Sequence, residues 1–297
     1  MNKILLLLLL IPTISFSQEN PDNSENNCEP ESEMERILFF MDSVESSMNY
    51  QKGVVQLEGG IATLKVPDGY KFLNKSQSEY VNELWDNPPS VLLGMLFLEE
   101  DSIFSQEYVV VIDYIEDGYI SDDEVNEMDY HELMEDIIDS EEDDNLEREK
   151  LGYIKIFSKG WASSPHYDEK NKKLHWAFEF NFEGDDYNIL NYKVLTLGRK
   201  GFITMNIISE MNNFELVNSD KDNFLSSIDF NKGYKYSEFN SATDKIAAYG
   251  IGGLIAGKVL AKLGFFAVIL KFWKLIMIFF IGLFAAFKKY IFRTKDK

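Results

Sequence analysis

The chain has 297 residues, of which 45% are hydrophobic, and it carries 50 acidic and 29 basic side chains. Of these, 49 acidic and 19 basic residues lie between positions 18 and 245, which gives this part a net charge of −30. So acidic a surface repels phosphate backbones and excludes nucleic acid as a partner, and the single cysteine, Cys28, excludes an internal disulfide.

The N-terminus has the pattern of an export signal. Residues 1–17, MNKILLLLLLIPTISFS, place Lys3 before an apolar run and end in small residues, as a cleavable signal peptide does. An uncleaved anchor is the alternative, although the apolar run is shorter than the ~20 residues that a span needs. Residues 18–52 are expected to form a mobile leader and a short helix from Met34 to Met48, where apolar residues recur at helical spacing.

The body, residues 53–240, is expected to be an acidic exported α+β domain. Two β-type runs flank Gly59 and Gly60 in VVQLEGGIATLKV, which favours a tight hairpin. The run EYVVVIDYIE is apolar on both faces, so we expect a strand in the interior of a sheet. Further strands are expected over residues 91–100, 153–162, 187–198 and 202–211, and helices over 76–85 and 214–228.

The clearest strand pattern is LHWAFEFNFE, in which large apolar residues alternate with other residues from Leu174 to Glu183. It predicts a strand with one buried and one solvent-exposed face. Short connections on its C-terminal side then predict an antiparallel meander. The fold class that follows is α+β, a largely antiparallel sheet with helices on one side, together with a C-terminal transmembrane helix.

The segment DYIEDGYISDDE resembles a twelve-residue calcium loop. Asp113, Asp117 and Glu124 would be its first, fifth and last ligands, but the third position is Ile115, which has no oxygen to donate. Calcium is the one cofactor that this pattern allows, and no other is expected. The carboxylates of the Asp113–Asp129 region would also supply pairs for acid/base chemistry.

An ordinary turn followed by a helix is the alternative for this segment. Asp122 or Asp123 would then cap an acidic helix that breaks near Asp143, with a second helical piece from Asn145 to Leu151. Acidic runs of this kind are usually solvated faces of helices.

The stretch GWASSPHYD is expected to be a short loop. Its Trp161, Tyr167 and Asp168, together with Arg199 of the GRKG turn, are the candidate ligand-binding residues, because aromatic rings and a basic group can form a platform. The alternatives are an aromatic lid over the sheet edge and, for Arg199, the tip of a hairpin.

Catalysis by a nucleophile is disfavoured, because it needs a base beside the nucleophile. The three histidines fall in an acidic helix (His131), in the expected loop (His166) and on the expected wet face of a strand (His175), and none lies in a nucleophile motif. The sequence also lacks the clustering of His and Cys that zinc sites show. The protein is therefore more consistent with a non-enzyme than with an enzyme.

The C-terminal fifth changes character. Residues 241–262 are expected to form a membrane-proximal, glycine-rich helix, 263–287 a transmembrane helix, and 288–297 a basic tail on the cytoplasmic side. A two-span hairpin is the alternative topology. Gly253, Gly257 and Ala261 recur every four residues, a spacing that lets membrane helices pack closely and allows a weak homo-oligomer.

Several ordered motifs resemble one family. They include VPDGYKFL, WDNPP, DYIEDGYISDDE, GWASSPHYD, LHWAFEF and LNYKVLTLGRKGFITMN, and they extend over residues 53–263. On these motifs the chain resembles a bacterial family of membrane-anchored proteins built on a domain of unknown function. The resemblance implies an exported domain with a C-terminal anchor, and it implies no activity and no functional residue.

Together these patterns favour a membrane-anchored envelope protein that acts as a non-enzymatic scaffold or protein-interaction domain outside the cytoplasmic membrane. Its partners would be the lipid bilayer and other envelope proteins. The alternative is a ligand- or calcium-binding sensor or a hydrolase that uses the Asp113–Asp129 region.

Overall fold

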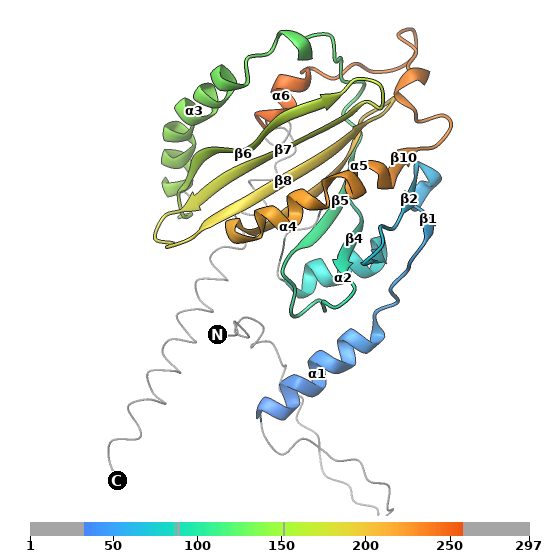
Figure 1. The fold of residues 1–297 in the computed structure, drawn as a ribbon, viewed down its shortest axis with the longest axis vertical. Coiled ribbons are helices and arrows are strands. Elements are labelled where there is room, and N and C mark those ends of the chain that lie inside the picture. The colour runs from blue at the N-terminus through green and yellow to red at the C-terminus, as the bar shows by residue number, and fades with distance from the viewer. Residues whose placement is uncertain (1–32, 86, 88–89, 151, 258–297) are drawn as a thin grey trace, which may run out of the picture.

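The structure, a computed structural model, describes residues 33–85, 87, 90–150 and 152–257 (Figure 1). The predicted signal peptide, most of the predicted leader, the predicted membrane span 263–287 and the basic tail 288–297 lie outside these residues. Within the described part of the chain, no helix is both long and apolar enough to cross a membrane.

A seven-stranded sheet forms the centre of the domain (Figure 1). All of its strand pairs are antiparallel. The predicted meander is confirmed, and EYVVVIDYIE is an interior strand as expected. In spatial order the strands are β3 (Tyr70–Asn74), β4 (Leu92–Leu98), β5 (Val109–Ile115), β9 (Phe202–Glu210), β8 (Asn188–Leu197), β7 (Lys173–Phe182) and β6 (Ile156–Asp168).

A second sheet of three short strands covers part of the first. It consists of β1 (Val54–Gln56), β2 (Ala62–Lys65) and β10 (Ile228–Phe230), with β2 in the middle. The predicted hairpin at Gly59 and Gly60 is confirmed, since β1 and β2 pair antiparallel and both glycines have positive φ angles, 73° and 65°. Glycine adopts such angles without steric cost.

Helices cover both faces of the large sheet, so the expectation of helices on one side is wrong. On one face, α4 (Phe214–Ser219) and α5 (Lys221–Ser227) share a core cluster with the small sheet. On the other face, α3 (Tyr130–Lys150) and α6 (Ile251–Ile255) pack over β7 and β8. The helix α2 (Lys75–Leu84) and the C-terminal end of α1 (Glu33–Ser47) pack over β4.

The same arrangement corrects the reading of LHWAFEFNFE. Leu174, Trp176 and Phe178 are buried beneath α3 and α6 as expected. The opposite face, however, also buries His175 and Ala177, because α4 and α5 lie against it. Alternation identified the strand but not the second layer, since small and polar residues can also be covered.

Two helix predictions need revision. The acidic helix α3 is continuous and does not break near Asp143. Its N-terminal cap is Asp129, whose carboxylate accepts hydrogen bonds from the backbone N–H groups of His131 (2.8 Å) and Glu132 (3.2 Å), rather than Asp122 or Asp123. The helix expected over 214–228 is divided into α4 and α5, which meet at Asp220.

The glycine-rich segment is mostly not helical where the structure describes it. The helix expected over 241–262 is described as far as residue 257, and of residues 241–257 only Ile251–Ile255 is helical. Gly257 has a φ of 75°, so it ends α6 and cannot continue a row of small residues from Gly253 along one helix face. Ala261, the third residue of that row, lies outside the described residues.

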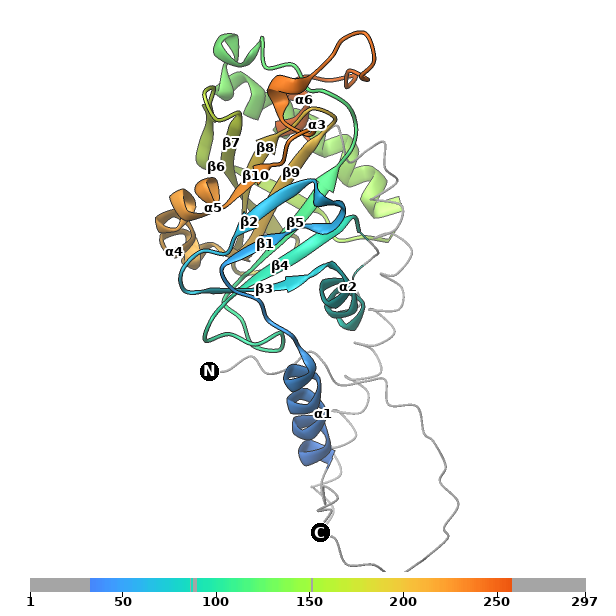
Figure 2. The same cartoon turned by 90° about the vertical axis from the view of Figure 1, so that its right-hand side faces the viewer.

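The first helix, predicted to begin at Met34, is confirmed as α1 and extends away from the sheets (Figure 2). Val44 near its C-terminal end is buried in the cluster over β4. Its N-terminal turns expose large apolar side chains, namely Met34, Leu38, Phe39 and Phe40.

Candidate functional site

The loop between β5 and α3, which contains the acidic motif, lies against the segment before α6. Tyr119 donates its backbone N–H to the Lys245 carbonyl (2.9 Å), and its own carbonyl accepts from Ala247 (2.8 Å). Gly118 makes this approach possible, because it has a φ of 112° and an added Cβ would lie 2.9 Å from two backbone atoms of the facing segment. Regions more than a hundred residues apart in sequence thus meet at one site.

The side chains of Asp122, Tyr167, Lys172 and Tyr236, here called the Asp122 network, hold this loop. The Oδ2 atom of Asp122 accepts from the Tyr167 hydroxyl (2.5 Å) and from the Lys172 ammonium (2.6 Å). Its Oδ1 atom accepts from the Tyr236 hydroxyl (2.8 Å). Burial alone would raise the pKa of Asp122, but these three hydrogen bonds together lower it. The carboxylate therefore stays ionised and joins three separate segments.

Aromatic rings surround the Lys172 ammonium. Its Nζ lies 5.2 Å from the ring centroid of Tyr236 and 6.0 Å from that of Tyr167, within the range of cation–π attraction. Tyr119 stacks on Tyr236 at 4.5 Å and on Phe239 at 3.9 Å between ring centroids. Lys172 has a φ of 56°, a conformation that costs a non-glycine residue on the order of 1 kcal/mol and that these contacts offset.

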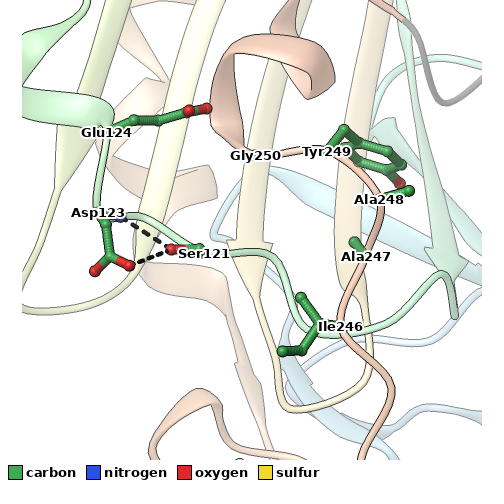
Figure 3. Close-up of a pocket in the computed structure, with 8 residues that line it drawn as sticks. All are labelled: Ser121, Asp123, Glu124, Ile246, Ala247, Ala248, Tyr249 and Gly250. Carbon is green, nitrogen blue, oxygen red and sulfur yellow. Dashed lines mark hydrogen bonds between the residues drawn. The ribbon is translucent and has the colours of Figure 1, made fainter.

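A shallow pocket of about 270 Å³ lies beside this network (Figure 3). Within it, Ser121 donates to the Asp123 carboxylate (2.7 Å) and accepts from the Asp123 backbone (3.2 Å). Glu124 accepts from the backbone of Gly252 (3.3 Å), and it approaches Gly250 so closely that a Cβ there would lie 2.2 Å from its Oε1. Its lining residues are Ser121, Asp123, Glu124, Ile246, Ala247, Ala248, Tyr249 and Gly250.

The three carboxylates of the expected calcium loop do not converge. Asp113 lies on β5, whereas Asp117 pairs with Lys245 (3.5 Å). Burial is the largest cause that raises the pKa of Tyr249, and its hydrogen bond to Asp117 is the next. Glu124 is turned toward α6. Across the described residues, no group of three or more His, Cys, Asp or Glu side chains could hold a metal ion. The spacing matches a ligand set in sequence only, because its first position, Asp113, belongs to strand β5.

A polar strip crosses the middle of the large sheet. The pKa of Asp113 is raised to about 6 by burial, against the opposing charge of Lys193, and burial lowers the pKa of Lys193. The Oδ1 atom of Asp113 is buried and has no hydrogen-bond partner among the described residues. Asn191 and Asn206 on the neighbouring strands bond to each other at 3.1 Å. Sequence reasoning missed this strip, because its members come from three strands.

The candidate ligand-binding residues are separated. Trp161 stacks on Phe178 at 4.6 Å and donates its indole N–H to the Tyr130 carbonyl (2.9 Å), which fastens α3 to the sheet. Asp168 accepts from the side chain (2.6 Å) and the backbone (3.1 Å) of Asn171, and these bonds lower its pKa. Asp168 therefore organises a turn, and Tyr167 belongs to the Asp122 network.

Arg199 is occupied by a carboxylate of the same chain. Its Nε and one terminal nitrogen donate to the two oxygens of Asp244, at 2.7 and 2.9 Å. The hydrogen bonds from Arg199 and from the Asn240 backbone lower the pKa of Asp244 to about 2. Arg199 is thus both a hairpin tip, as one alternative predicted, and an anion contact whose anion is intramolecular.

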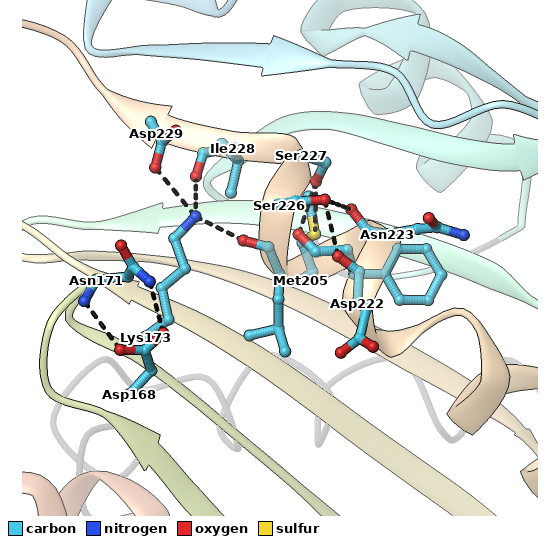
Figure 4. Close-up of polar contacts among 12 residues, drawn as sticks. Asp168, Asn171, Lys173, Met205, Asp222, Asn223, Ser226, Ser227, Ile228 and Asp229 are labelled. Atoms are coloured by element: carbon cyan, nitrogen blue, oxygen red, sulfur yellow. Dashed lines mark hydrogen bonds and ion pairs between the residues drawn. The ribbon is translucent and has the colours of Figure 1, made fainter.

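A buried lysine ties α5 to the sheet (Figure 4). Lys173, at the start of β7, donates to the backbone carbonyls of Leu225 (2.6 Å) and Ile228 (2.8 Å) and pairs with Asp229 (3.0 Å). A cation at the carbonyl end of a helix is favourable. Nothing in the sequence near Lys173 identified this role, because its partners lie more than fifty residues away.

The fold and these contacts define an α+β domain whose antiparallel sheet is covered on both faces and fastened by tyrosine and carboxylate side chains. The chain belongs to the family described as "Protein of unknown function (DUF2167)", whose model matches residues 49–285. The resemblance to a family built on a domain of unknown function is thereby confirmed. No curated protein matches the chain in sequence.

Solved structures give only distant likenesses. Cyanobacterial PsbP from Synechocystis sp. PCC 6803 is 10% identical, with a TM-score of 0.34, and the match covers 62% of this chain and 93% of that one. The Ran-binding protein Mog1p from Saccharomyces cerevisiae is 15% identical, with a TM-score of 0.30, over 60% of this chain and 84% of that one. These values are too low to carry an argument about fold or function.

Proposed function

We propose that this protein is a membrane-anchored envelope protein whose acidic domain lies outside the cytoplasmic membrane and acts through contacts with other envelope proteins. The N-terminal signal pattern, the apolar segment 263–287 and the basic tail motivate this placement. The domain would be the part of the protein that meets its partners.

The observation that carries the proposal is the burial of α6. Ile251, Leu254 and Ile255 are at most 5% exposed and belong to the core cluster over β7 and β8. The apolar segment begins six positions after Gly257, a length of chain that reaches at most about 20 Å. A bilayer helix there would hold the domain close to the membrane surface, as a scaffold requires.

Two further features support a role in protein contacts rather than in chemistry. The net charge of −30 over residues 18–245 disfavours contact of the body with anionic head groups. The polar side chains that the sequence offered for ligand binding, Tyr167, Asp168 and Arg199, make contacts within the domain itself.

The test is the location of the full-length protein in bacterial cells, compared with two truncated forms. A chain ending at Phe287 lacks only the basic tail and should remain in the membrane after alkaline extraction. A chain ending at Gly257 should be recovered in the soluble envelope fraction, because it lacks the apolar segment.

Protease added to spheroplasts should degrade the body of the full-length protein and leave a C-terminal tag intact. A protected body, or retention of the Gly257 truncation in extracted membranes, would contradict the proposal.

A further inference from the structure

Two of the three histidines, nine residues apart in sequence, face each other in the fold. β6 and β7 form a hairpin in which His166 and His175 are direct cross-strand partners. Their imidazole centroids lie 5.4 Å apart with an interplanar angle of 48°. Two imidazoles bound through one nitrogen each to a tetrahedral ion, at about 2.0–2.1 Å, place their centroids about 5–5.5 Å apart. The observed spacing matches that of a shared ion.

The inner ring of this pair is held by a third side chain. The Nδ1 atom of His175 lies 3.1 Å from the Tyr192 hydroxyl, and His175 is only 8% exposed. The pKa of His175 is lowered to about 4, mainly by burial and also by the nearby His166 and Lys221, so its ring is neutral at physiological pH. If Nδ1 donates its hydrogen to Tyr192, Nε2 carries the free lone pair, which is the arrangement of most metal-bound histidines.

The outer ring is open to solvent. His166 is exposed on the edge strand β6, so an ion could reach the pair without opening the core. The charged groups of α5 that act on His175, Lys221 and Asp222, have opposite signs and oppose each other's effect on its charge. No third ligating side chain completes the group among the described residues, so water would fill the remaining positions.

We propose that His166 and His175 form a two-imidazole site for a divalent ion of the zinc and copper class, with Tyr192 as the positioning residue. Neutral imidazole suits these ions better than it suits calcium or magnesium, which prefer oxygen ligands. Binding forms two metal–nitrogen bonds and displaces water from the ion. The site lies outside the Asp122 network and does not depend on it.

The proposal is tested with the detergent-solubilised full-length protein, prepared without a histidine tag and freed of metal with a chelator. Zn²⁺ is titrated by calorimetry at neutral pH, and Cu²⁺ is added for electron paramagnetic resonance. We expect one Zn²⁺ site per chain and a Cu²⁺ spectrum with two coupled nitrogens. His166→Ala, at an exposed position, should weaken Zn²⁺ binding by more than ~10-fold without changing the melting temperature of the metal-free protein.

Two further variants distinguish this site from ordinary surface binding. His131→Ala removes the exposed histidine that pairs with Glu135 at 3.4 Å, and it should leave Zn²⁺ affinity unchanged. Tyr192→Phe keeps the buried ring but removes the hydroxyl, and it should weaken binding by ~10-fold or more. Equal affinity in the wild-type and His166→Ala proteins, or a loss of binding in His131→Ala alone, would overturn the proposal.

Discussion

Asp113 and Asp122 lie nine residues apart in the same acidic motif, yet the fold places them in opposite surroundings. Asp122 receives three hydrogen bonds, one of them from a lysine, and its pKa is lowered. Asp113 lies on the sheet with a buried oxygen that has no partner among the described residues, and its pKa is raised to about 6. The difference teaches that the partners of a carboxylate, rather than its sequence motif, decide whether its charge stabilises the fold.

Removing the paired carboxylate should have the largest effect. Asp122→Ala removes the acceptor of Lys172 and of the Tyr167 hydroxyl, whereas the Tyr236 hydroxyl keeps the Ile120 carbonyl at 2.9 Å. We expect the free energy of unfolding to fall by about 2–3 kcal/mol. The magnitude is below that of a fully buried pair, because the side chains of Asp122 and Lys172 are 14% and 28% exposed. Urea denaturation at pH 7 measures it.

Asp123→Ala is the matched control for that substitution. Asp123 is the next residue in the chain, is exposed, and bonds only to Ser121 in the described structure. Its loss should cost less than about 1 kcal/mol. Equal losses in the two variants would show that the Asp122 network contributes no more to stability than the exposed Asp123 does.

Substitution of Asp113 should change the free energy of unfolding in the opposite direction. Because burial raises its pKa to about 6 in the folded protein, its contribution favours folding below the unfolded pKa near 3.8 and is lost as the pH rises through 6. Asp113→Asn removes the charge, so we expect it to stabilise the protein at pH 7 by on the order of 2 kcal/mol and to have little effect at pH 4. Urea denaturation from pH 4 to pH 7 measures the difference.

The pH profile separates the two carboxylates. The contribution of Asp122, whose pKa is lowered, is present above its unfolded pKa and is lost as the pH falls through its folded pKa. Asp122 should therefore make the wild-type protein less stable as the pH falls at the acid end. Asp113 should make it less stable as the pH rises from about 4 to 6. If Asp113→Asn were destabilising at pH 7, an interaction with Lys193 would outweigh the burial cost.

A third carboxylate tests whether geometry matters as well as charge. Arg199→Lys keeps a cation beside Asp244 but loses the two parallel hydrogen bonds at 2.7 and 2.9 Å. We expect a small loss of stability, the smallest of the three effects, measured as a lower thermal midpoint. No change in the midpoint would mean that charge alone holds this turn.

The sequence predicted the strands well where they alternate or lie between glycine turns, as in β7, β8 and β9. It failed at GWASSPHYD, where a short loop was expected. That segment is the second half of β6, an edge strand with register shifts near Ser163 and His166. Edge strands accept proline, because one of their sides needs no ladder hydrogen bond.

The same misreading hid the histidine pair. With 169–172 taken as the turn, His166 and His175 lie symmetrically about it and must face each other. The wrong prediction of a helix break near Asp143 has a different cause. Asn145 exchanges two hydrogen bonds with the backbone of Ile156, at 2.7 and 2.9 Å, and this tertiary contact holds α3 continuous. Local sequence carries no record of such a contact.

The central claim is that Asp122 fastens the acidic loop as part of the fold, in a geometry in which Asp113, Asp117 and Glu124 do not converge. The most direct test is the melting temperature of the full-length protein with and without millimolar Ca²⁺. We expect no shift, because Asp113, Asp117 and Glu124 do not converge in the described structure. A rise that disappears in Asp117→Ala and Glu124→Ala would contradict the account, because calcium would then have gathered the loop into a ligand set.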